Sequence, residues 1–267
     1  MPAWPLYEVL DGTAAAGFGG VGLDAYTLRG HVEAGGSLVE LGAGVTARGL
    51  ECTDVGVIPI GAPGVRTVAE TLAELASVTG APTCIAAFSG PVGQQQAIAE
   101  LSECADVLRG AGARLALEFA SYGGLTRLAD AVALCETVGW ERCGLLVDTW
   151  HFFRTGAPWS DLRALAGEQI ALVHVNDGPL EGTGDPVVEG RFRRRPVGQG
   201  SFPLAEFAAA LDATGYSGTL STEVLADDVR GQSPRNGARM LLHALREHWP
   251  ASHPAASVPP VVAGERT

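Results

Sequence analysis

Seven short apolar runs alternate along the chain with longer amphipathic stretches. The core of each run is continuous in hydrophobicity, which is typical of parallel strands buried on both faces. Strands that alternate with helices in this way predict βα units built around a parallel sheet. The predicted strands are residues 20–24, 50–60, 82–89, 114–120, 143–148, 170–176 and 218–225.

The stretches between the predicted strands carry helical stripes. Apolar residues at positions i, i+3, i+4 and i+7 lie on one face of a helix. Ser233 followed by Pro234 predicts the start of the last helix, because serine caps helix N-termini and proline suits their first turn. Two of the stripes are formed by Leu204, Phe207, Ala208 and Leu211, and by Ala238, Leu241, Leu242 and Leu245.

The number of predicted strands bears on the fold class. A closed (β/α)8 TIM barrel has eight strands and about 250 residues, and this chain has 267 residues. Residues 5–16 already form a helical stripe before the first predicted strand. We therefore predict an α/β fold with a single TIM barrel domain over residues 1–249, whose first strand is missing or atypical. Residues 250–267 are rich in Pro and Ala without a core pattern, and we predict a disordered tail there.

Acidic and histidine side chains stand at the ends of four consecutive predicted strands. In a TIM barrel the C-terminal ends of the strands form the active site, and a carboxylate in an apolar run is rarely buried unless it is paired or bound to metal. Three carboxylates and one imidazole suit Mn²⁺ first, with Mg²⁺, Co²⁺ or Zn²⁺ as alternatives. The predicted ligands of one divalent metal ion are Glu118, Asp148, His174 and Glu223.

Each of these residues also has a plainer interpretation. A single acid at a strand end often caps the next helix or anchors a loop. A single histidine in an apolar strand such as Val173-His174-Val175 can be a satisfied core residue. The recurrence of the pattern on four consecutive strands is what favours a metal site.

The composition excludes several classes of function. All 18 basic residues are arginine, so no lysine of this chain can form the Schiff base of aldolases or pyridoxal enzymes. The formal net charge of −12 disfavours a nucleic-acid partner. The sequence shows no leader and no apolar run long enough to span a membrane, and its five cysteines lack a C-x-x-C pair. We therefore predict a cytoplasmic protein with reduced core cysteines and no membrane partner.

Several segments carry a resemblance to a known family. LALEFA, GLLVDTWHFF, LVHVND, RRRPVGQGSFPL and GTLSTEVL look like segments of the xylose isomerase-like TIM barrel superfamily of sugar and sugar phosphate isomerases and epimerases. That superfamily includes inosose dehydratases and ketose 3-epimerases. The resemblance covers about residues 5–248, and its most specific part is the D-x-x-H pair followed by H-x-x-D and a glycine pair.

The resemblance implies roles for individual residues. It places the metal on the four ligands named above and implies substrate contacts from His151 and from an arginine shortly before Gly198. That arginine is Arg194, with Arg193 and Arg195 as alternatives. Two departures from the family pattern, the missing first strand and Phe119 where relatives often carry proline, concern the substrate side of the pocket.

The expected chemistry is proton transfer beside a carbonyl group. A divalent metal chelated by a carbonyl and a neighbouring hydroxyl stabilises an enediolate, and Glu118 and Glu223 are predicted to serve as its base and acid. We expect an isomerase or epimerase that acts on a polyhydroxy ketone or aldehyde: a sugar, a sugar phosphate or a cyclitol ketone. A metal-dependent dehydratase of the inosose or dehydroshikimate type is the alternative.

Two rival functions belong to other classes. A DNA-repair endonuclease of the same superfamily would need a histidine-rich site and a basic surface, whereas this acidic chain has six histidines. A metal-binding relative without catalysis would be expected to have lost one of the predicted ligands. Barrels of this kind often pair, so a homodimer is a further expectation.

Overall fold

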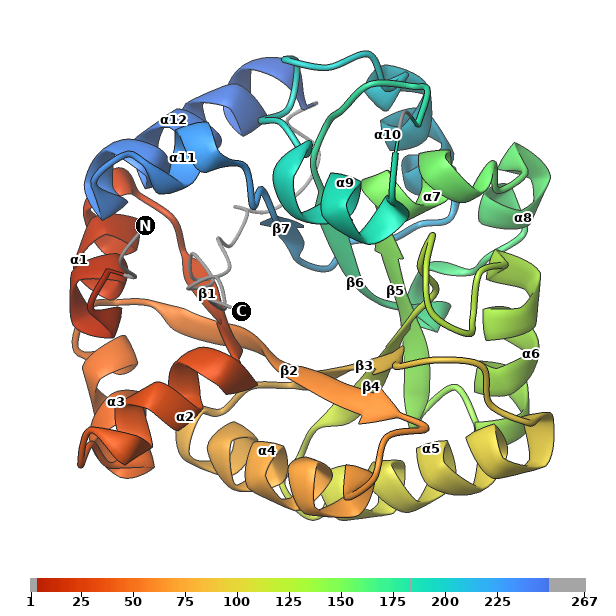
Figure 1. The fold of residues 1–267 in the computed structure, drawn as a ribbon, viewed down its shortest axis with the longest axis horizontal. Helices are drawn as coiled ribbons and strands as arrows, with labels where there is room; N and C mark the ends of the chain where they lie inside the picture. The colour runs from red at the N-terminus through yellow and green to blue at the C-terminus, as the bar shows by residue number, and fades with distance from the viewer. Residues whose placement is uncertain (1–3, 183, 250–267) are drawn as a thin grey trace.

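The computed structural model describes residues 4–182 and 184–249 (Figure 1). Its elements are α1 (Leu6–Ala16), β1 (Gly20–Asp24), α2 (Ala25–Glu33), α3 (Leu38–Thr46), β2 (Glu51–Ile60), α4 (Val65–Thr79), β3 (Thr83–Phe88), α5 (Gln94–Arg109), β4 (Arg114–Glu118), α6 (Leu128–Val138), β5 (Cys143–Asp148), α7 (Thr149–Thr155), α8 (Trp159–Arg163), the 3-10 helix η1 (Gly167–Gln169), β6 (Ile170–Val175), α9 (Pro186–Phe192), α10 (Leu204–Ala213), β7 (Leu220–Thr222), α11 (Asp227–Arg230) and α12 (Pro234–His248). The predicted tail lies outside the described residues.

The strands form one parallel sheet that curls into a barrel. Its order is β1 to β7 in sequence, each strand paired with the next. Helices surround the strands in an outer ring (Figure 1). The predicted TIM barrel is therefore confirmed, with the seven strands that the apolar runs predicted. Among the described residues no pairing joins β1 to β7, so the barrel has a seam where an eighth strand would lie.

Helices α1 and α12 pack closely beside this seam. A Cβ atom added at Gly12 of α1 would lie 2.6 Å from the backbone nitrogen of Arg235 in α12, so only glycine allows this approach. The indole Nε1 of Trp4 donates a hydrogen bond to the carbonyl of Gln232, at 3.1 Å. The two helices thus hold the edges of the sheet together without strand pairing.

The apolar core has two parts. The larger part fills the space between the sheet and the helices. A smaller cluster lies inside the barrel, because alternate side chains of a barrel strand point inward. It consists of one residue from each of four neighbouring strands: Ile85, Ala116, Leu146 and Leu172.

The cysteines and the helices bear on two further expectations. All five cysteines are free and buried, as predicted, although the sulfur atoms of Cys135 and Cys143 are 3.6 Å apart. No helix within residues 4–182 and 184–249 is both long and apolar enough to cross a bilayer.

Candidate metal centre

Strand periodicity brings three of the predicted ligands to the inner face of the barrel. Glu118, Asp148 and His174 each lie two residues beyond an inward-facing apolar residue of β4, β5 or β6. Side chains two positions apart in a strand point to the same face, so the three polar groups stand above the apolar cluster at the C-terminal rim. Asp148 and His174 are direct partners in the β5–β6 register.

Two positions differ from the sequence-based expectation. Glu223 was expected inside the last strand, but β7 ends at Thr222 and Glu223 directly follows it. His151, three positions beyond the predicted strand 143–148, lies in a helix, α7, which begins directly after β5. His151 lies in the first turn of α7 and so stays above the end of β5. Glu223 directly follows β7, so its side chain also lies at the rim.

The ligand-type atoms gather in two overlapping groups. Oxygen and nitrogen atoms of Asp148, His174 and Glu223 all lie within 4.8 Å of one another. A second group with the same spacing joins Glu118, Asp148 and His151. Asp148 is common to both groups, but no single group among the described residues holds all four predicted ligands, because Glu118 falls in the group with His151.

The two carboxylate oxygens of Asp148 have different partners. Oδ1 accepts hydrogen bonds from the backbone nitrogen of Trp150, at 2.7 Å, and from the side-chain amide of Asn176, at 2.9 Å. Oδ2 is turned toward the site, where the guanidinium of Arg194 donates to it. Oδ1 of Asp148 therefore acts as a helix cap, which is the plainer interpretation of a strand-end acid. Oδ2 remains directed at the candidate metal site.

His174 is the observation that best tests whether a metal fits. Its side chain is 5% exposed, and Nδ1 lies 3.3 Å from Oε2 of Glu223. Burial lowers the pKa of His174, but the adjacent Glu223 and the nearby Asp148 and Asp54 raise it to about 9. Neither ring nitrogen, however, forms a hydrogen bond of acceptable geometry with a described residue. A buried imidazole without hydrogen bonds is costly, whereas metal ligation uses such a nitrogen lone pair. Together with three carboxylates, it forms a donor set suited to a divalent cation.

His151 is a buried, neutral ring with a neighbour at each ring nitrogen. Burial lowers the pKa of His151 to about 4, despite the opposing charge of Asp148. Nδ1 accepts a hydrogen bond from the backbone nitrogen of Ser121, at 3.0 Å, and the guanidinium NH2 of Arg194, which can only donate, lies 3.3 Å from Nε2. That Nε2 also lies 3.7 Å from Oε1 of Glu118, so it faces the site.

Arg194 is the arginine that the structure brings to the cluster. Its side chain is 3% exposed, and it donates to Asp148 and Glu223, which lie on either side of it. The neighbouring Arg193 and Arg195 are exposed instead. A turn anchored by Asp177 follows, because the carboxylate of Asp177 accepts hydrogen bonds from the backbone nitrogens of Gly178, Gly198 and Phe202.

A buried ion pair fixes the helix that leads into Arg194. Arg154 of α7 pairs with Glu189 of α9, and their side chains are 6% and 5% exposed. Arg154 also lies over the ring of Trp150, 4.7 Å from its centre, and donates to the carbonyl of Leu180. Helix α9 lies in front of the ends of β5 and β6 in Figure 1. We call this contact the Arg154–Glu189 clasp.

The two predicted catalytic glutamates have opposite electrostatics. Burial, with the nearby charges of Asp148 and Glu223, raises the pKa of Glu118 to about 8. Burial alone would also raise the pKa of Glu223, but Arg194 and His174 hold it well below its usual range. Glu118 is therefore the more basic of the two carboxylates, and Glu223 is a stably charged one.

Sequence reasoning missed Asp54, a buried acid in β2. Burial raises the pKa of Asp54, while the nearby His174 opposes that shift. Its carboxylate occupies space that a side chain at position 22 would fill, since a Cβ atom on Gly22 would lie 2.5 Å from Oδ1. An acid inside an apolar strand was the available signal, but it stands in mid-strand and not at the strand end.

The comparison with known families decides the classification. A profile of the xylose isomerase-like TIM barrel matches residues 10–248. The chain belongs to this family. A solved structure of the same barrel type, that of the IOLI protein with a binding zinc atom, superposes with a TM-score of 0.82 over 93% of this chain and 95% of that one, at 16% sequence identity.

Curated relatives of the xylose isomerase-like chain match it over shorter segments. A 3-dehydroshikimate dehydratase of Pseudomonas aeruginosa is 35% identical over 122 residues, which are 43% of this chain and 19% of that protein. An inosose isomerase of Halalkalibacterium halodurans is 29% identical over 126 residues, which are 46% of this chain and 44% of that protein. The matched segments thus span less than half the length of these relatives.

Proposed function

We propose that this chain is a divalent-metal-dependent isomerase or epimerase that acts on a polyhydroxy ketone or aldehyde. The observation that carries the proposal is the pair of overlapping ligand groups around Asp148, with the buried ring of His174, which faces Glu223, among them. Relatives with inosose isomerase and dehydroshikimate dehydratase activity support a substrate of this size and polarity.

Glu118, Asp148, His174 and Glu223 would hold the metal. When bound, a divalent cation supplies Lewis acidity toward a carbonyl and an adjacent hydroxyl, which acidifies the neighbouring C–H bond. Mn²⁺ is the first candidate from the donor set. Zn²⁺ is the second, because the IOLI protein was solved with a zinc atom.

The side chains of this chain account for the proton transfer. Glu118 is the more basic carboxylate and is proposed to take the proton next to the carbonyl, and Glu223 is proposed to act on the opposite face. The guanidinium of Arg194 would donate hydrogen bonds to substrate oxygens, and the neutral ring of His151 beside it would contact the same substrate. The apolar layer below the rim keeps water from reaching the reacting carbon from inside the barrel.

A dehydratase is the second candidate function. It shares the proton-abstraction step and differs only in the loss of a hydroxyl group from the neighbouring carbon. The 35% identity to a 3-dehydroshikimate dehydratase over 122 residues is the observation that favours it.

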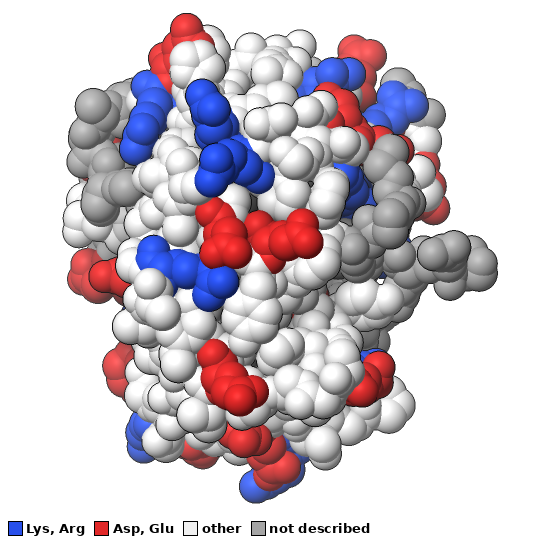
Figure 2. All heavy atoms as spheres, turned by 90° about the vertical axis from the view of Figure 1, so that its left-hand side faces the viewer, with Lys and Arg blue, Asp and Glu red and all other residues white. Residues whose placement is uncertain are grey.

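The surface disfavours the nuclease alternative. Figure 2 shows acidic and basic side chains interspersed with uncharged ones on the face it displays, without a continuous basic stripe. A protein that grips a phosphate backbone needs such a stripe, and the net charge of this chain is −12.

Solvent deuterium incorporation tests the proposal. Purified protein loaded with Mn²⁺ or Zn²⁺ is incubated in D₂O with ketoses, ketose phosphates, inososes and 3-dehydroshikimate, with and without a chelator. We expect deuterium at the carbon beside the carbonyl of at least one compound, abolished by chelation and by Glu118→Gln. A deuterated isomer supports the isomerase, and loss of water supports the dehydratase. No exchange with any compound, or exchange that survives proven metal removal, would overturn the proposal.

A further inference from the structure

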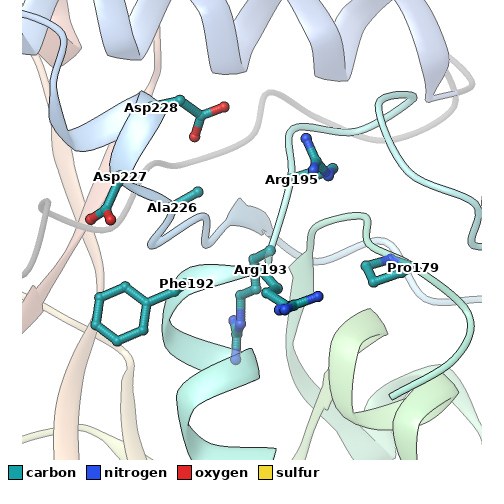
Figure 3. Close-up of a pocket in the computed structure, with 8 residues that line it drawn as sticks. Pro179, Phe192, Arg193, Arg195, Ala226, Asp227 and Asp228 are labelled. Carbon is teal, nitrogen blue, oxygen red and sulfur yellow. The ribbon is translucent and has the colours of Figure 1, made fainter. Parts of the chain in front are cut away.

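A second cavity opens beside the candidate metal centre. It has a volume of about 400 Å³ and lies between the loop after α9 and helix α11 (Figure 3). Arg194 contributes to its lining, so the cavity and the metal cluster share a side chain. Pro179, Phe192 and Ala226 supply apolar surface, and Ala226 is only three positions beyond Glu223. The cavity is therefore placed to take whatever part of a substrate projects away from the reacting carbon.

Besides Arg194, two arginines and two aspartates line the cavity, and in the described part of the chain they form no ion pairs with each other. Arg193 and Arg195 lie on the loop side, and Asp227 and Asp228 belong to α11 on the other side (Figure 3). Within the described residues no ion pair of 4.0 Å or less joins these arginines to these aspartates. Arg194, the fifth charged group, is already committed to Asp148 and Glu223.

One donor of Arg194 remains free toward a ligand. Its NH1 nitrogen is occupied by the two carboxylates, whereas Nε is buried and has no hydrogen-bond partner among the described residues. A buried N–H without a partner is costly unless a bound molecule or water completes it. Arg194 is the side chain that the cavity shares with the metal cluster, so a molecule that spans both would contact its guanidinium.

We propose that this cavity binds the distal hydroxyl groups of an uncharged polyol substrate and discriminates against phosphorylated ones. This inference rests on the proposed function. Guanidinium groups donate to hydroxyl oxygens and carboxylates accept from hydroxyl hydrogens, so a polyol satisfies both walls at once. The ring of Phe192 is 47% exposed and has the guanidinium of Arg230 5.8 Å from its centre, so its uncovered part offers an apolar face for the C–H side of the same chain or ring.

A phosphate group would bind more weakly in this cavity. Two arginines attract it, but Asp227 and Asp228 on the opposite wall repel it, and the third arginine is already neutralised by the two carboxylates of the metal cluster. A site built for phosphate usually presents cations or backbone N–H groups without facing carboxylates. The balance of two positive and two negative groups therefore favours the uncharged ligand.

Direct binding of unreactive polyols tests the inference without reliance on turnover. The probes are myo-inositol and D-mannitol with their monophosphates, titrated calorimetrically into protein loaded with Mn²⁺. Wild-type protein is expected to bind at least one of the two uncharged polyols at least tenfold more tightly than its phosphate. The double variant Asp227→Ala/Asp228→Ala should weaken binding of that polyol by about tenfold or more, since hydrogen bonds to charged groups are strong.

A charge-neutral exchange and a matched control complete the experiment. Asp227→Asn/Asp228→Asn keeps hydrogen-bonding groups but removes the negative charge, so it should narrow or reverse the discrimination against phosphate. Asp130→Asn/Glu136→Gln changes the net charge equally on exposed positions of α6 and should leave all affinities within twofold. Metal content and melting temperature of each variant establish that it is folded.

Three results would overturn the inference: tighter binding of the phosphates by wild-type protein, no saturable binding of either uncharged polyol, or aspartate variants that behave like the control. These outcomes are separate from a failure of the proposed function. If the chain binds the polyols with the expected aspartate dependence but exchanges no deuterium, the polyol subsite is supported and the proposed enzymatic function is refuted.

Discussion

The guanidinium NH1 of Arg194 lies 2.9 Å from Oδ2 of Asp148, and the two side chains are 3% and 0% exposed. The same nitrogen reaches Glu223, so one arginine joins the end of β5 to the end of β7. Buried charges of this kind stabilise a structure little by their presence, but the removal of one partner is costly because the others are left uncompensated. The metal cluster and the substrate cavity therefore depend on a single positively charged group.

Replacement of that group should destabilise the protein strongly. Arg194→Gln leaves Asp148 and Glu223 facing each other without a positive neighbour, and we expect the free energy of unfolding of metal-free protein to fall by about 3 kcal/mol. Arg194→Lys should recover part of this loss. Urea unfolding followed by circular dichroism measures both. A loss below about 1 kcal/mol for Arg194→Gln would mean that the guanidinium is hydrated and not truly buried.

The two glutamates should be needed for turnover beyond any role as ligands. Glu118→Gln and Glu223→Gln keep an oxygen that reaches the metal but remove a basic carboxylate. We expect each to lose about 10²- to 10⁴-fold in rate even at saturating Mn²⁺. Steady-state kinetics across a metal titration checks this, with Glu136→Gln on the exposed face of α6 as control. Recovery of the wild-type rate at high metal would reduce that glutamate to a ligand.

His151 should separate metal binding from activity. Its Nε2 faces Glu118 at 3.7 Å and its Nδ1 is engaged by Ser121, so the ring is positioned to contact substrate at the edge of the site. His151→Ala should keep most of the bound metal, measured by elemental analysis, while it loses most of the turnover. Asp148→Ala serves as the comparison that loses both. Equal loss of metal in the two variants would place His151 among the ligands.

The low pKa of His151 also predicts a pH dependence of stability. In the folded state its pKa is about 4, below the 6.5 of a free histidine. Between these values the unfolded chain binds a proton that the folded chain does not. The free energy of unfolding should therefore fall as the pH is lowered from about 6.5 to about 4, by up to about 3 kcal/mol from this residue. Above pH 6.5 its contribution is constant.

Comparison with a variant isolates this contribution from other titrating groups. Urea unfolding of metal-free wild-type and His151→Gln protein at several pH values gives the difference in slope. The variant should lose the part of the acid destabilisation that lies between pH 6.5 and pH 4. Parallel curves for the two proteins would show that the His151 ring is protonated as easily in the folded state as in water.

The Arg154–Glu189 clasp should position Arg194 from a distance. Arg154→Met removes the cation of this buried ion pair, loosens α9, and should raise KM for the substrate about tenfold or more with a smaller change in kcat. Arg66→Gln, which removes exposed ion pairs with Glu70 and Glu103, is the control and should change neither constant. The reversed pair Arg154→Glu/Glu189→Arg should restore part of the affinity. An unchanged KM in Arg154→Met would refute a positioning role.

The fold could be predicted from the sequence because its signals are local. Each strand is a continuous apolar run, and the twofold repeat of side-chain direction sets which residue of a strand end faces the barrel. Glu118, Asp148 and His174 follow inward-facing residues of the apolar layer by two positions, so their meeting is a consequence of three separate local patterns.

Other parts of the site depend on contacts that no local pattern reports. Asp54 lies in mid-strand, and its place inside the barrel requires the absence of a side chain at Gly22 on the neighbouring strand. The clasp joins residues 35 positions apart. The choice of Arg194 over its two arginine neighbours follows from the turn anchored by Asp177, which fixes the direction of each side chain in the run.

The contact between α1 and α12 has a consequence for the order of folding. Trp4 and Gln232, which meet beside the seam, are separated by 228 positions. Contacts of such long sequence separation are slow to form, and a chain that emerges from the ribosome folds its earlier segments first. The backbone edge of β1 thus waits for the last helix of the chain, and the interval before α12 arrives is when this protein is most open to pairing with a foreign strand.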